Sequence, residues 1–137
     1  MDISKVATQR TQPVGPYSFA EFLDMARSFH SFPAPGLLLG GYMVQKARAG
    51  LDPDTLFEAV VETRKCLPDA VQLLTPCSTG NGWMRVIHLG RFALSLYDKY
   101  SGQGQRVRIV PERLEEWPEI RDWLFCRFHM HPFFGFI

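Results

Sequence analysis

The sequence is poor in cysteine and has no long apolar run. Its three cysteines, Cys66, Cys77 and Cys126, are few and odd in number, which argues against a secreted disulfide framework and leaves core packing, metal ligation or redox chemistry. The apolar run at 37–44 is much shorter than the ~20 residues that a membrane-spanning helix needs. No signal-like apolar stretch follows the first basic residues. We therefore expect a cytoplasmic protein that does not associate with membranes.

An excess of charge of either sign is also absent. The formal net charge is +1, from 15 Lys and Arg against 14 Asp and Glu, and the basic residues are scattered. A nucleic-acid-binding surface needs clustered cations, so we expect no nucleic-acid partner. The apolar fraction of 46% and the charged fraction of 21% are ordinary for a globular protein. A length of 137 residues fits a single domain, which we place at 17–137 after a flexible lead at 1–16.

Helix signals dominate the first half of the chain. Ser18 and Glu21 have the spacing of a capping box, and apolar residues at helical spacing follow them. Prolines then interrupt the pattern and favour a new helix start. Gly40-Gly41 weakens the interior of the second helix, which indicates a closely packed neighbour. Helices are predicted at 19–28, from 35 or 36 to 49, and at 68–75.

Short apolar segments between turn residues predict strands in the second half. We expect Leu89-Gly90 to form a tight turn between the second and third strands, within an antiparallel meander. An amphipathic pattern predicts a last helix at 115–128. This order of elements indicates an α+β fold in which helices pack on an antiparallel sheet. The strands are predicted at 56–63, 84–88, 92–98 and 106–110.

The loop at 75–82 is the richest local signal. Its glycines permit close backbone approach, so the loop could present the thiol of Cys77 to a ligand, or it could be a tight turn around a buried structural cysteine. No Gly-Lys-Ser/Thr follows, which excludes a Walker phosphate loop. Cys66 precedes the third predicted helix, where a helix N-terminus favours a thiolate, although a small buried hydrophobe is an equal alternative.

Histidines supply the other candidate ligands. His30 follows the first predicted helix, where it could interact with the helix dipole or, with partners from elsewhere, bind a metal. Cys126, His129 and His131 form a C-x2-H-x-H pattern of zinc-ligand types, although the surrounding aromatic residues favour a packed tail over a closed zinc site. Glu62 and Asp69 are a weak candidate pair for acid–base chemistry.

Two sets of residues resemble the motifs of one family. The first set is Phe29-His30 with Pro35-Gly36-Leu37, and the second comprises Glu62-Thr63, Cys66, Asp69-Ala70-Val71-Gln72 and the 77–82 loop. Over about 19–114 the sequence is similar to the formylmethanofuran dehydrogenase E-subunit family. The resemblance implies an α+β fold, often in a homodimer, with a bound zinc-like metal.

The sequence departs from the family's first motif. The family's ligands there are a His, a second His two residues later and a Cys directly before Pro-Gly. His30 matches the first, but Phe32 and Ala34 stand at the other two positions, and neither residue type can bind a metal. The paired cysteines of a C-terminal zinc ribbon, which many members carry, are also missing. The expected metal ligands are therefore His30, Cys77 and Cys66, with Cys126, His129 and His131 as additional candidates, in a pocket lined by Phe32, Ser78, Thr79, Gly80 and Trp83.

We therefore expect a metal-associated accessory protein or a small-ligand-binding protein. The resemblance implies zinc or another divalent transition metal, and a link to a molybdenum or tungsten enzyme system. Two alternatives stay open. One is an enzyme with Cys77 as nucleophile and His30 as base, and the other is a structural dimer module with a vestigial pocket. The predicted site depends on the fold bringing His30 next to Cys77.

Overall fold

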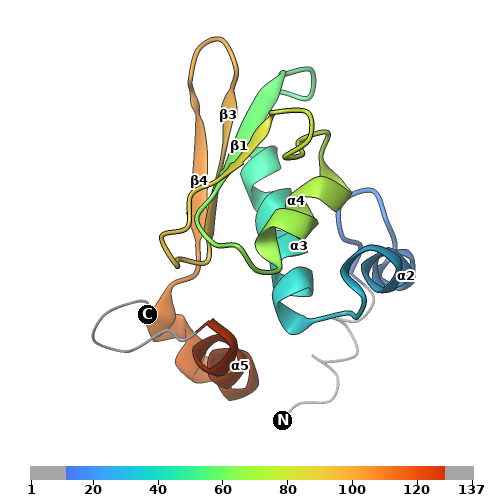
Figure 1. Ribbon diagram of the computed structural model, residues 1–137, viewed down its shortest axis with the longest axis vertical. Coiled ribbons are helices and arrows are strands. Elements are labelled where there is room, and N and C mark those ends of the chain that lie inside the picture. The colour runs from blue at the N-terminus through green and yellow to red at the C-terminus, as the bar shows by residue number, and fades with distance from the viewer. Residues whose placement is uncertain (1–11, 129–137) are drawn as a thin grey trace.

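Helices pack on one side of a sheet, and a last helix lies at one end of the molecule (Figure 1). The computed structural model describes residues 12–128, with side chains up to residue 124. The α+β class is confirmed. The helices are α2 (Phe19–His30), α3 (Pro35–Ala49), α4 (Leu67–Leu74) and α5 (Pro118–Phe128), with a 3-10 helix η1 (Pro111–Glu116). The strands are β1 (Phe57–Val61), β2 (Met84–Val86), β3 (Ala93–Asp98) and β4 (Gly104–Arg108).

The four-stranded sheet is mixed, which corrects the expectation of an antiparallel sheet. Its order is β2-β1-β3-β4, and β1 pairs with β2 in parallel, while the other two pairs are antiparallel. The predicted tight turn between β2 and β3 is wrong, because the chain crosses the end of β1 there. The N–H groups of Leu89 and Arg91 both donate to the carbonyl of Glu62. A helical connection, α4, joins β1 to β2 and makes these two strands parallel.

The core lies between the sheet and α3. Val61 of β1 pairs with Leu94 of β3, which pairs in turn with Val107 of β4, and none of the three is more than 9% exposed. Alternate strand residues share a face, so these side chains point the same way, toward the helices. The opposite face carries polar contacts, among them the hydrogen bond from the Tyr97 hydroxyl to Glu58.

The glycine pair of α3 is explained by its neighbours. A Cβ at Gly40 would lie 3.0 Å from the Cβ of Ala70 in α4, and one at Gly41 would lie 2.7 Å from Cγ1 of Val14. The predicted close neighbour is therefore confirmed at both positions. Val14 is fully buried and pairs with Tyr17, so packed structure already begins within the expected lead at 1–16.

Helix ends follow the sequence signals except near the C-terminus. The capping box is confirmed, since the Ser18 hydroxyl accepts from the Glu21 N–H and the Glu21 carboxylate accepts from the Ser18 N–H. The single helix predicted at 115–128 is wrong at its start. Pro118 disfavours helical geometry at Trp117, so the chain forms η1 first and starts α5 at the proline. No helix among residues 12–128 is long and apolar enough to span a membrane.

Candidate functional site

His30, Cys66 and Asp69 form a hydrogen-bonded series where two helices meet. His30 is the last residue of α2, and Cys66 and Asp69 belong to the cap and first turn of α4. His30 Nδ1 lies 2.6 Å from Asp69 Oδ2, and His30 Nε2 lies 3.4 Å from Cys66 Sγ. A carboxylate only accepts hydrogen bonds, so Nδ1 carries a proton and donates it to Asp69. Nε2 is thereby directed at the thiol.

The backbone is strained on both sides of this series. Among the described residues, the non-glycine residues with positive φ are Ser31 (φ 74°), next to His30, and Cys66 itself (φ 61°). The Leu67 N–H donates to the carbonyl of Lys65 at 2.7 Å, which closes a γ-turn centred on Cys66. The positive-φ form of this turn is rare and strained. Strained residues gather at functional sites, so this geometry marks the same place as the side-chain contacts.

The series faces a cavity of about 320 Å³. Arg64 and Lys65 give the wall positive charge, and Trp123 of α5 and Phe32 add aromatic surface. The Phe32 ring lies 5.8 Å from the His30 ring and is half exposed. The N-terminus of α4 also ends here, and the positive end of a helix dipole stabilises an anion. The surroundings of Cys66 therefore favour a negative group, whether a thiolate or a bound anion.

The donor atoms fit part of a zinc-like site. Zinc–sulfur and zinc–nitrogen bonds of about 2.3 and 2.0 Å at a tetrahedral angle hold the two donor atoms about 3.5 Å apart. The Sγ–Nε2 distance is 3.4 Å, and the second ring nitrogen is held by a carboxylate, as is usual for histidine ligands. Within residues 12–128, however, no group of three or more His, Cys, Asp or Glu could hold a metal ion. His30 and Cys66 would thus supply two ligands.

The structure places Cys77 at another point. Cys66 caps the start of α4, whereas Cys77 follows its end, and a helix of eight residues is about 12 Å long. Cys77 is 1% exposed, and its thiol donates to the Phe57 carbonyl at 3.4 Å. Burial raises the pKa of this thiol, which disfavours the thiolate that a metal or a nucleophilic reaction requires. Of the three predicted ligands, the fold therefore joins His30 and Cys66 and leaves Cys77 out.

The other pocket residues predicted from the sequence are divided in the same way. Phe32 lines the His30 cavity, but Ser78, Thr79, Gly80 and Trp83 do not. The loop binds itself instead, because the Ser78 and Asn81 side chains each accept the other's backbone N–H. Thr79 bonds to Gln72 of α4. This loop is built as a self-contained turn.

Three predicted ligands lie outside the described part of the chain. These are the side chain of Cys126 and the residues His129 and His131. The weak pairing of Glu62 with Asp69 does not form, since Glu62 binds Arg106 at 2.7 and 2.9 Å and Asp69 binds His30. The hydrogen bond from Arg106 holds the pKa of Glu62 below its ordinary value.

Asp69 is the site residue that sequence reasoning undervalued. Its signal was present, because a spacing of three residues at a helix start places Cys66 and Asp69 on one side. Trp123 carried no such signal. It reaches the cavity because α5 packs against Gly36, where any Cβ would collide with the Trp123 indole.

Comparison with known proteins agrees with this geometry. Residues 29–129 match the family described as "FmdE, Molybdenum formylmethanofuran dehydrogenase operon", which is well over half of the chain. The chain belongs to the FmdE family. The match begins at the residue before His30 and includes Cys66 and Asp69.

Two relatives of this FmdE-family chain extend the comparison. A solved structure, a tungsten formylmethanofuran dehydrogenase FmdE-like protein from Syntrophus aciditrophicus, is 48% identical with a TM-score of 0.81, over 85% of this chain and 63% of that one. A probable S-adenosyl-L-methionine-binding protein from Archaeoglobus fulgidus is 29% identical over 100 residues, or 67% of this chain. The chain spans only 27% of that protein's length.

Proposed function

We propose that this FmdE-family chain is a metal-associated accessory protein of a molybdenum- or tungsten-dependent enzyme system. It holds a zinc-like divalent metal through His30 Nε2 and Cys66 Sγ. The observation that carries the proposal is the 3.4 Å distance between these atoms, with the imidazole oriented by Asp69. Family membership and the tungsten-associated name of the Syntrophus protein support the enzyme system.

The chain's own residues have distinct roles in this proposal. Cys66 is the anchor, since a thiolate ligand prefers soft and borderline metals. Asp69 fixes the tautomer of His30 and raises the basicity of Nε2. Two protein ligands leave coordination positions open for a partner or a transferred ligand, which suits an accessory protein better than a closed structural site. A bound metal would supply Lewis acidity and a fixed positive charge.

Cobalt(II) titration tests the proposal. Cobalt substitutes for zinc, and a thiolate ligand gives it a charge-transfer band in the near ultraviolet. We expect one equivalent to produce the band in the native protein, and Cys66→Ser and His30→Gln to abolish it. Cys77→Ala is the matched control and keeps the band, because its thiol faces Phe57 instead. A native protein without the band, or a band lost in Cys77→Ala alone, would refute the assignment.

A second candidate, thiol chemistry at Cys66, is favoured by the γ-turn. A strained turn between a strand and a helix also presents the nucleophile of the α/β-hydrolases. Here β1 and α4 flank Cys66, with His30 as base and Asp69 as the group that orients it. This candidate replaces Cys77 by Cys66 in the enzyme expected from the sequence.

Alkylation separates the two candidates. With thiol chemistry, a metal-free protein should react with iodoacetamide at Cys66 much faster than at Cys77, and Asp69→Asn should slow the reaction. With metal binding, added zinc should protect Cys66. An unreactive Cys66 in a protein that takes up no metal would leave a vestigial pocket. A homodimer is a further proposal that follows from the family, and analytical sedimentation at micromolar concentration tests it.

A further inference from the structure

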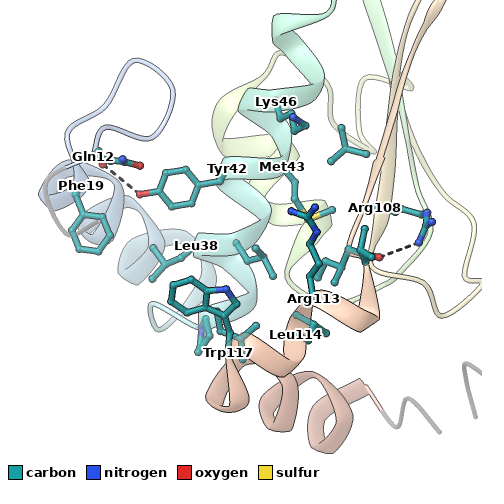
Figure 2. A pocket seen from close by; sticks show the side chains of 16 residues that line it. Gln12, Phe19, Leu38, Tyr42, Met43, Lys46, Arg108, Arg113, Leu114 and Trp117 are labelled. Carbon is teal, nitrogen blue, oxygen red and sulfur yellow. Dashed lines mark hydrogen bonds between the residues drawn. The ribbon is translucent and has the colours of Figure 1, made fainter. Parts of the chain in front are cut away.

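A second and larger cavity shares α5 with the His30–Cys66 site. Its volume is about 660 Å³, and residues of α3, β4, η1 and the first turn of α5 line it (Figure 2). Pockets for small organic molecules usually measure about 300–1,000 Å³. Ile120 of α5 lines this cavity, whereas Trp123, three residues later, lines the smaller one. The motifs that carry the family resemblance account for none of the large cavity's polar residues.

The walls of the cavity are apolar. Leu38, Tyr42 and Met43 of α3 approach Leu114 and Trp117 across the space that Figure 2 shows. Val107 and Ile109 complete the wall at the end of β4. Trp117 is 44% exposed, which is unusual for so large an apolar side chain. A molecule with an apolar body would remove this surface from water, which is favourable.

The charged residues of the cavity are all cationic. Lys46, Arg108 and Arg113 come from three different elements, and no acidic side chain within residues 12–128 lines the cavity. Other arginines of the protein have carboxylate partners, such as Arg106 with Glu62 and Arg121 with Glu115. No ion pair joins Lys46, Arg108 or Arg113 to a carboxylate in that part of the chain. An excess of three positive charges thus borders an apolar space.

We propose that this cavity binds a free amphipathic organic anion, with an apolar body in the cavity and a carboxylate or phosphate-type head at the mouth. Lys46 and Arg113 are the head-group ligands, because both are exposed and Arg108 already donates to the Ile109 carbonyl at 3.4 Å. A cationic amphiphile would be repelled by the same charges, and a neutral one would leave them without a partner. The proposal does not rest on metal binding at the smaller cavity.

Isothermal titration with three ligands of equal chain length tests the proposal. Decanoate, decanol and decyltrimethylammonium share an apolar body and differ in head-group charge. Below their micelle concentrations, we expect decanoate to bind one site about five- to tenfold more tightly than decanol, the factor that partly exposed charges give. The cationic ligand should bind more weakly than both.

Two variants assign the head and the body of the ligand to residues. Arg113→Met keeps an apolar stem and removes the charge, so decanoate should fall to the affinity of decanol while decanol is unaffected. Leu39→Gln should weaken both ligands together. Arg27→Met is the matched control, because it removes one exposed cation of α2, which pairs with Asp24 and does not line the cavity. Circular dichroism checks that each variant is folded.

Three outcomes would overturn the proposal. Equal affinity for the three ligands would show a site that ignores charge, and the absence of any binding would show that another part of the chain fills the cavity. Decanoate binding that dissociates a dimer in sedimentation would show that a second copy covers this face. Selectivity for decanoate that survives in Arg113→Met would place the anion elsewhere.

Discussion

Glu62 connects three parts of the sheet through its carboxylate. It accepts two hydrogen bonds from Arg106 of β4, and Arg91 lies 3.8 Å away. The Glu62 side chain is 9% exposed, while that of Arg106 is 41% exposed, so the acid is the partner that depends on the bond. A buried carboxylate without such donors would lose more free energy from desolvation than a surface acid does.

Glu62→Gln tests this dependence on pH. The hydrogen bond from Arg106 lowers the pKa of Glu62 in the folded state, so the charged form adds stability above the unfolded pKa, near 4.5, and this stability is lost as the pH falls through the lower folded pKa. The variant should be less stable by about 1–3 kcal/mol at pH 7. Near pH 3 the difference should shrink. Urea denaturation at both pH values measures it, with exposed Glu119→Gln as control, and a constant difference would contradict the argument.

Residue identity predicted the site better than residue order did. His30 and Cys66 were named from the sequence because their chemistry and motif positions mark them. Cys77 has the same chemistry, but the sequence does not say which end of α4 faces His30. The length of that helix then separates the two thiols, and only the packing of α2 against the start of α4 decides between them.

At the scale of the element, α3 is the support on which the rest is packed. Its glycine pair lets α4 and the segment before α2 approach its backbone. The hydrophobic pattern and the prolines predicted the bounds of this helix, since local signals determine where a helix starts and ends. The partner of β2 was not predictable in the same way. Strand pairing is a long-range choice, and Leu89-Gly90 matched a hairpin turn as well as the observed crossing of β1.

Gly41→Val tests the close approach. A Cβ there would lie 2.7 Å from Val14 and 3.1 Å from Phe22, so one of them must move. We expect the free energy of unfolding to fall by about 1–3 kcal/mol from overpacking. Gln45→Val is the matched control on the exposed side of α3, where only the helix propensity changes, by about 0.5 kcal/mol. Equal effects of the two variants in urea denaturation would mean that the glycine serves no packing role.

At the scale of the whole molecule, α5 forms part of the wall of both cavities. Leu124 is fully buried and anchors the helix, so changes at its neighbours need not detach it. Ile120 and Trp123 line different cavities. The sequence predicted the amphipathic helix but not this division, because its packing depends on the contact of Trp123 with Gly36 in α3.

Trp123→Ala and Ile120→Ala should therefore have opposite effects on the two cavities. Removal of the indole uncovers the smaller cavity, so we expect faster alkylation of Cys66 by iodoacetamide with unchanged decanoate affinity. Removal of the Ile120 side chain takes apolar surface from the larger cavity, so decanoate should bind about three- to tenfold more weakly, as expected for a few lost methyl groups, while Cys66 reacts at the native rate. Peptide mapping by mass spectrometry and isothermal titration give the two readouts. If each variant changed both readouts equally, α5 would act as a single hinged cover, because only then would the loss of either side chain open the molecule on both sides.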